Sequence, residues 1–138
     1  MATNTDSRLG SALRGLAFGR IALGVVSLAA PRGTARLFGI RPTPELTYMT
    51  RIFGARAIAL GLGYLGASET ERVRLQRLAL MVDVIDTVHG AAHLVRGDVP
   101  RPIALSMVGM TGGYMAVGAA RFALDLRPGA DAGRDSGD

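Results

Sequence analysis

The chain lacks cysteine, lysine and tryptophan, and aromatic residues make up only 5% of its 138 residues. Without cysteine, the protein cannot form disulfides, iron–sulfur clusters, thiolate zinc sites or a cysteine nucleophile. Apolar residues reach 49%, a content that excludes a disordered or collagen-like chain. The length fits one domain, which we place at residues 1–127. The small and polar residues of 128–138 predict a disordered C-terminal tail.

All 16 basic residues are arginine, and the formal net charge is +5. A nucleic-acid-binding surface needs its basic residues clustered on one face. Here the arginines are spread between apolar runs, without a recognition-helix pattern or a ladder of aromatic residues. We therefore expect no nucleic-acid partner. Arginines at the flanks of apolar helices are typical of the headgroup region of a membrane.

Four apolar runs follow one another along the chain, and none alternates with the period of a strand. They cover about Leu13–Ala30, Ile52–Ser68, Leu75–Val95 and Ile103–Ala120. The last run is uncharged throughout, and about 20 such residues cross the hydrocarbon core of a bilayer. The fold class predicted here is all-α: a bundle of four transmembrane helices.

A soluble four-helix bundle is the alternative, but each of its helices would need a broad polar stripe. The fourth run has no such stripe. Glycine and alanine also recur at small-xxx-small spacing, as at Gly15 and Gly19, which lets membrane helices approach closely. These features favour an integral membrane protein.

The segment between the first two runs, residues 31–50, combines helix-breaking prolines with an apolar face and three arginines. It predicts a short interfacial half-helix. Residues 69–74 and 96–102 are charged or proline-containing and predict turns. With four spans, both termini share one side of the cell membrane. A slight arginine excess places that side in the cytoplasm.

A polar stripe runs along the third helix, formed by Asp83, Asp86, His89 and His93. At about 100° per residue, these positions share one third of the helix surface. Ionisable groups are costly at membrane depth, so the stripe should face the bundle interior and find partners there. By depth, Arg20 and Arg56 are the expected partners of the aspartates.

Three interpretations of this stripe compete. The ion pairs could serve only to fix helix register. Asp83, Asp86 and His89 could instead perform acid–base chemistry, because the pKa of histidine lies near neutrality. A metal site is the third, but no other helix supplies a histidine, so we predict neither a metal nor a cofactor.

Two arginines neutralise two aspartates, which leaves the histidines as surplus polar groups. We therefore expect a cavity beside His89. The candidate ligand-binding residues form a wider set of charged, imidazole and phenol side chains: Arg20, Arg56, His93, Tyr64 and Tyr114.

Three motifs carry a resemblance to a known family: Arg36–Arg41 (RLFGIR), Phe53–Gly63 (FGARAIALGLG) and Val82–Asp86 (VDVID). Together they resemble a family of small bacterial four-helix membrane proteins, catalogued as a domain of unknown function. More loosely, the size and helix number are similar to DoxX-like membrane proteins, some of which are linked to quinone or sulfur redox chemistry. The cysteine chemistry of that family cannot operate here.

We expect an accessory or small-ligand-binding membrane protein. Its partners would be the lipid bilayer and either a lipophilic small molecule or another membrane protein, and a homo-oligomer stays open. The alternative is a membrane-embedded enzyme that acts on a lipophilic substrate.

Overall fold

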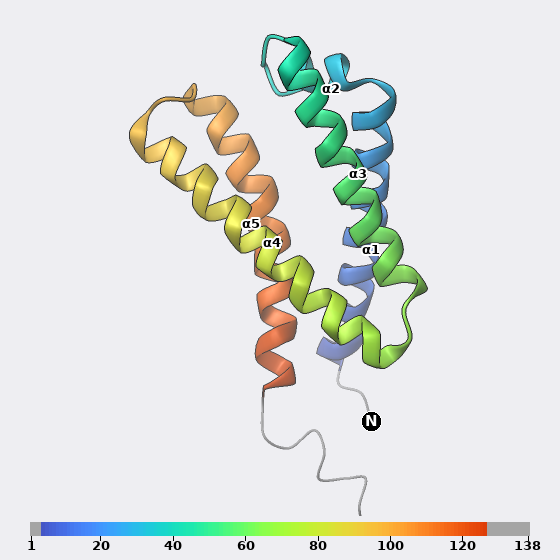
Figure 1. Ribbon diagram of the computed structural model, residues 1–138. Coiled ribbons are helices and arrows are strands. Elements are labelled where there is room, and N and C mark those ends of the chain that lie inside the picture. The colour runs from blue at the N-terminus through green and yellow to red at the C-terminus, as the bar shows by residue number, and fades with distance from the viewer. Residues whose placement is uncertain (1–3, 127–138) are drawn as a thin grey trace, which may run out of the picture.

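The computed structural model describes residues 4–126, and within them every regular element is a helix (Figure 1). The five helices follow in the order α1 Asn4–Ala29, α2 Pro31–Leu37, α3 Pro44–Gly66, α4 Glu69–Arg96 and α5 Arg101–Asp125. This confirms the predicted all-α class, and α2 is a short helix in the segment predicted to hold one. The predicted C-terminal tail lies outside the described residues.

The helix ends follow from local sequence signals. Thr43 accepts a hydrogen bond from the backbone of Leu46, 3.2 Å away, and Pro44 opens α3. Ser68 and Glu71 form a capping box at the start of α4. The expectation of a turn at residues 69–74 is therefore wrong, because this box extends the helix back to Glu69. At its other end α4 stops at Gly97, whose φ of 69° is left-handed.

The four long helices are arranged as two antiparallel pairs, α1 with α3 and α4 with α5 (Figure 1). Most helix contacts lie within the pairs, and the two pairs touch each other less. They diverge at the end that carries α2, and the described chain begins and ends at the opposite end (Figure 1). This divergence produces the cleft described below.

Glycines bring the backbones together within each pair. A Cβ atom on Gly24 would lie 2.6 Å from the carbonyl oxygen of Gly54, so α1 and α3 meet there backbone to backbone. In the second pair, a Cβ atom on Gly90 would lie 2.8 Å from Val108. Small residues therefore do pack inside the bundle, but not at the spacing named from the sequence. A Cβ atom on Gly15 would meet nothing within 4 Å, and one on Gly19 would lie 3.2 Å from the hydroxyl group of Tyr114.

The distribution of side chains is the reverse of that in a water-soluble bundle. The buried hydrophobic residues of the described chain are all alanines: Ala17, Ala35, Ala57 and Ala104. Large apolar side chains such as Phe18, Leu62 and Val88 point outward and are more than half exposed. Such an exterior is suited to lipid, since it leaves a broad apolar surface uncovered.

Three of the described helices are long and apolar enough to cross a bilayer: Ser7–Ala29 within α1, Glu69–Arg96 and Arg101–Asp125. The 23-residue α3 is not among them, because Arg51 and Arg56 interrupt its apolar stretch. The chain therefore has the helices of a small membrane protein, with three spans clear by composition.

Candidate functional site

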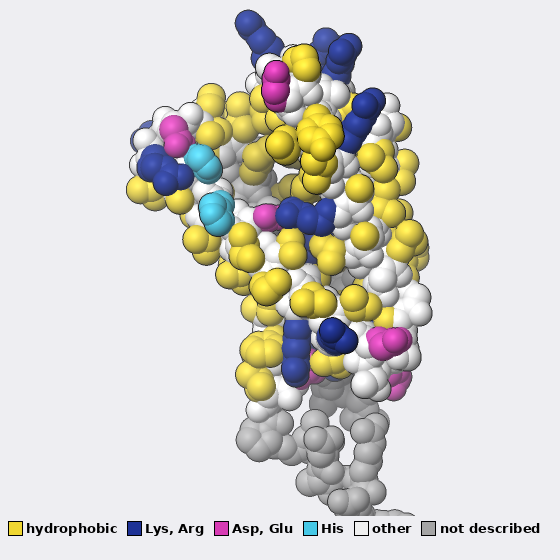
Figure 2. All heavy atoms as spheres, viewed as in Figure 1, with side chains coloured by type: hydrophobic (Ala, Val, Ile, Leu, Met, Phe, Trp, Pro, Cys, Tyr) yellow, Lys and Arg dark blue, Asp and Glu magenta, His cyan; other side chains and the backbone are white. Residues whose placement is uncertain are grey.

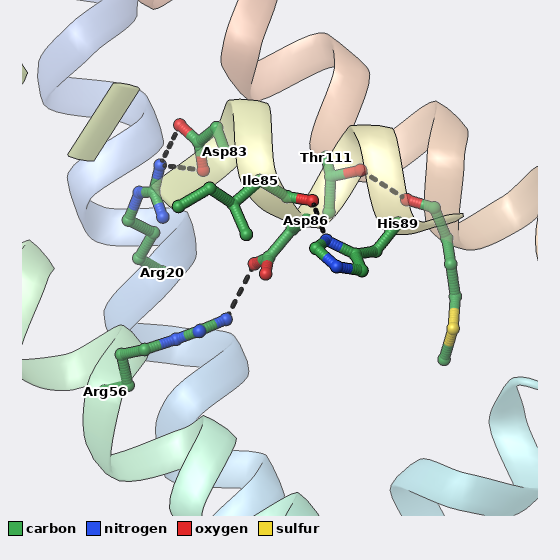
Figure 3. Close-up of polar contacts among 8 residues, drawn as sticks. Arg20, Arg56, Asp83, Ile85, Asp86, His89 and Thr111 are labelled. Atoms are coloured by element: carbon green, nitrogen blue, oxygen red, sulfur yellow. Dashed lines mark hydrogen bonds and ion pairs between the residues drawn. The ribbon is translucent and has the colours of Figure 1, made fainter. Parts of the chain in front are cut away.

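A buried ion pair joins the two helix pairs at mid-length. The Nη2 atom of Arg20, in α1, donates to both carboxylate oxygens of Asp83, in α4, at 2.7 and 2.5 Å (Figure 3). Only 14% of the Arg20 side chain and 6% of the Asp83 side chain are exposed. The guanidinium also lies 4.4 Å from the ring centroid of Tyr114, in α5, in a cation–π contact. This layer links three helices and leaves no room for a ligand between the charges.

A second ion pair lies about one turn further along α4 and is more open. The Nη2 atom of Arg56, in α3, donates to an oxygen of Asp86 at 2.7 Å (Figure 3). The side chains are 44% and 27% exposed. The predicted pairing of the two arginines with the two aspartates is confirmed, and this second pair faces an open space.

That space is a cleft of about 390 Å³ between the diverging pairs. Figure 2 shows it as a hollow, with the histidine side chains along one rim and an acidic and a basic side chain at its floor. Its walls are mainly apolar and come from α2, α3, α4, α5 and the segment that joins α2 to α3. The polar side chains on its walls are those of Thr34, Thr50, Arg56, Asp86, His89, His93 and Thr111.

His89 is held in one orientation by its own helix. Its Nδ1 atom lies 2.8 Å from the carbonyl oxygen of Ile85 (Figure 3). A carbonyl oxygen only accepts, so Nδ1 carries the proton and Nε2 is the nitrogen with a free lone pair when the ring is neutral. The cavity expected beside His89 is present.

His93 lies at the outer end of the cleft. Its Nδ1 atom lies 2.8 Å from Oδ1 of Asp98, in the segment between α4 and α5. This hydrogen bond is the main cause that holds the pKa of Asp98 below its ordinary value, with smaller contributions from the charges of His93 and Arg96.

The structure divides the predicted site residues into two groups. Arg56, Asp86, His89 and His93 line the cleft. The others, Arg20, Asp83, Tyr64 and Tyr114, lie away from it and surround a void of only about 40 Å³.

Tyr64 lies furthest from the cleft along α3, where its ring centroid is 5.6 Å from the guanidinium carbon of Arg72. Asp83 is enclosed by Arg20 and does not reach the cleft wall.

Several residues that line the cleft are not among the predicted site residues. Met49, Met107 and Met110 contribute flexible thioether side chains to the wall, and Phe38 joins them from the end of α2. Met107 and Met110 have the spacing of one helix face, which is a usable signal. Met49 gave none, because its position depends on how α3 packs against the other pair.

Within residues 4–126, no group of three or more metal-binding side chains is placed to hold a metal ion. No family model matches the chain, and neither a curated protein nor a solved structure shows significant similarity to it. The evidence on function therefore comes from the geometry of the cleft.

Proposed function

We propose that this chain is a four-span protein of the cell membrane that binds a small lipophilic molecule in the cleft between its helix pairs. The observation that carries the proposal is the cleft itself, a space of about 390 Å³ with mainly apolar walls and an ion pair at its floor. Ligand sites commonly have about 300–1,000 Å³ and combine apolar walls with a few convergent polar groups.

The fourth span in this proposal is α3. It packs along α1 through the backbone contact between Gly24 and Gly54, so it occupies the same depth as α1. Its 23 residues give a length of about 34 Å at 1.5 Å per residue, enough to cross the hydrocarbon core. Arg56 is tolerated there because Asp86 neutralises it. Four spans place both termini on one side, which we propose is the cytoplasm.

The motifs that resemble small bacterial four-helix membrane proteins agree with this topology, and we propose membership of that group. The ion pair at the floor of the cleft is the part of the site that would orient a bound molecule. The apolar walls would hold its body, and the methionines allow these walls to adapt to different shapes.

The test is native purification in a mild detergent, followed by mass spectrometry of the lipophilic molecules that co-purify. We expect a stoichiometric small molecule on the natural sequence and its loss from Thr50→Phe, which places a phenyl ring in the cleft beside the ion pair. Thr47→Phe is the matched control. Thr47 lies one turn earlier on α3 and, like Thr50, donates to a carbonyl oxygen four residues before it, but it does not line the cleft.

Equal recovery of the molecule from both variants would contradict binding in the cleft. A stoichiometric protein in place of a small molecule would favour the accessory role.

Acid–base catalysis is the second candidate, and one observation favours it. His89 presents an unprotonated Nε2 atom in its neutral form, and Asp86, one turn away, lines the same cleft. Under this alternative Asp83 has a structural role, because Arg20 encloses it. Turnover of the co-purified molecule with a pH dependence that His89→Gln removes would favour the enzyme.

A further inference from the structure

The hydrogen-bonding groups on the cleft wall are strongly biased towards acceptors. Each of the three threonines, Thr34, Thr50 and Thr111, donates its hydroxyl proton to the carbonyl oxygen four residues earlier, at 3.1, 2.7 and 3.1 Å. With their protons used inside their own helices, these hydroxyl groups offer only lone pairs to the cleft.

The two histidines have the same bias. Nδ1 of His89 donates to the carbonyl oxygen of Ile85, and Nδ1 of neutral His93 donates to the carboxylate of Asp98. In each neutral ring the remaining nitrogen, Nε2, is an acceptor. Neutral His89 therefore presents an acceptor as well, and His93 does so whenever its ring is uncharged.

The ion pair at the floor supplies one donor residue, Arg56, and one acceptor residue, Asp86. A single nitrogen of Arg56 bonds to one oxygen of Asp86, so the guanidinium has further N–H groups and the carboxylate has further lone pairs. When both histidines are neutral, Arg56 is the donor among the described polar side chains that line the cleft, and the others are acceptors.

From this inventory we infer that the ligand is a neutral lipophile with a hydroxyl group. The inference rests on the proposed function. A hydroxyl group can donate to Nε2 of His89 and accept from Arg56 at the same time, which a ketone, ether or ester cannot do.

The charges of the cleft exclude the ionic alternatives. Arg56 and Asp86 neutralise each other, so a bound ammonium or carboxylate would bring an unbalanced charge to membrane depth. A carboxylate would also face the lone pairs of the histidines and threonines. A neutral hydroxyl group meets neither penalty.

The test uses the full chain in lipid nanodiscs and three probes with one skeleton: 4-hexylphenol, its methyl ether 4-hexylanisole, and the ionised 4-hexylbenzoate. Binding is measured by equilibrium partition against empty nanodiscs. We expect the phenol to bind about tenfold more tightly than the ether, the effect of one well-formed hydrogen bond in a partly buried site. The benzoate should bind more weakly than the phenol.

Variants of His89 test the assignment of the acceptor. His89→Leu should reduce the preference for phenol over ether to about one. His89→Gln keeps an acceptor oxygen and should retain most of the preference. Val88→Leu is the control, since Val88 is exposed on the same helix and does not line the cleft. Should His89→Leu fail to fold, the ratio of phenol to ether binding on the natural sequence still tests the hydroxyl inference.

The outcomes separate this inference from the proposed function. Equal binding of phenol and ether, both abolished by Thr50→Phe, would overturn the hydroxyl inference and leave ligand binding in place. Tightest binding of the benzoate would also overturn the hydroxyl inference and leave ligand binding in place. Binding of no probe above the level of Thr50→Phe would overturn both.

Discussion

Burial distinguishes the two ion pairs, although both join an arginine to an aspartate of α4. The Arg20–Asp83 pair is almost closed to its surroundings, whereas Arg56 is 44% exposed in the cleft. A buried charge that loses its partner keeps its desolvation penalty, while an exposed charge can find other partners. The two pairs should therefore respond differently to the loss of one partner.

We predict that Asp83→Ala lowers the free energy of unfolding in detergent by about 3–5 kcal/mol, because it leaves the Arg20 cation buried and alone. The double variant Arg20→Ala with Asp83→Ala should lose less than the single variant. Asp86→Ala is the comparison and should cost less than Asp83→Ala, because Arg56 is 44% exposed in the cleft and is less desolvated than Arg20. Thermal unfolding followed by circular dichroism measures all of these. Identical losses for the single and double Asp83 variants would contradict a stabilising pair.

A second prediction at the residue scale concerns Asp98. Its pKa lies below the ordinary value of 3.8, chiefly because of the hydrogen bond from His93. A lowered carboxyl pKa favours the folded state above the ordinary value, and this contribution disappears as the pH falls through the lowered one. His93→Leu should raise the pKa of Asp98 more than Arg96→Leu does, as measured by carbon NMR of the labelled carboxyl group. A larger effect of the Arg96 variant would assign the shift to charge instead.

At the scale of the helices, close backbone contacts hold each pair together. Gly24 in α1 faces the backbone of Gly54 in α3, where an added Cβ atom would lie 2.6 Å from a carbonyl oxygen. A backbone atom cannot turn aside as a flexible side chain can, so the helices would have to separate. By contrast, a Cβ atom on Gly15 would meet nothing within 4 Å.

We predict that Gly24→Ala lowers the free energy of unfolding by about 1–3 kcal/mol, the usual cost of overpacking. Gly15→Ala, the matched control on the same helix, should be neutral or slightly stabilising, since alanine favours the helix over glycine. Thermal unfolding in the same detergent gives the comparison. Equal stability of both variants would show that α1 and α3 do not meet as closely as described.

The polar stripe and its partners could be predicted because they follow from helix periodicity and depth. Asp83, Asp86, His89 and His93 share a face by spacing alone, and the need to neutralise buried charges points to Arg20 and Arg56. The start of α4 differs from the prediction, because the charged residues after Ser68 are typical of a turn. The capping box formed by Ser68 and Glu71 is the signal in the sequence that indicates the earlier start. The positions of Met49 and Phe38 in the cleft wall could not be predicted from the sequence, since they depend on the angle at which the two helix pairs diverge.

At the scale of the whole molecule, the number of spans decides where the termini lie. Three helices are clear spans by composition, and α3 is the fourth in the proposed topology. An even number of crossings agrees with a described chain that begins and ends at the same end of the bundle (Figure 1).

We predict that reporters fused to the two termini report the same side of the membrane. A fluorescent protein that matures only in the cytoplasm serves at either end, and a periplasmically active phosphatase is the reciprocal control. Opposite results at the two termini would show that α3 does not cross. Release of the untagged protein by alkaline carbonate would contradict membrane insertion altogether.

The placement of the charges also has a consequence for how the protein is made. Both arginines of the ion pairs belong to the first two long helices, and both aspartates belong to α4. In the proposed four-span topology, α1 and α3 therefore enter the membrane before the aspartates that pair with Arg20 and Arg56 have been synthesised. A chain that stops before α4 leaves Arg20 and Arg56 without these partners. The same contacts that stabilise the finished bundle thus distinguish it from its unfinished half.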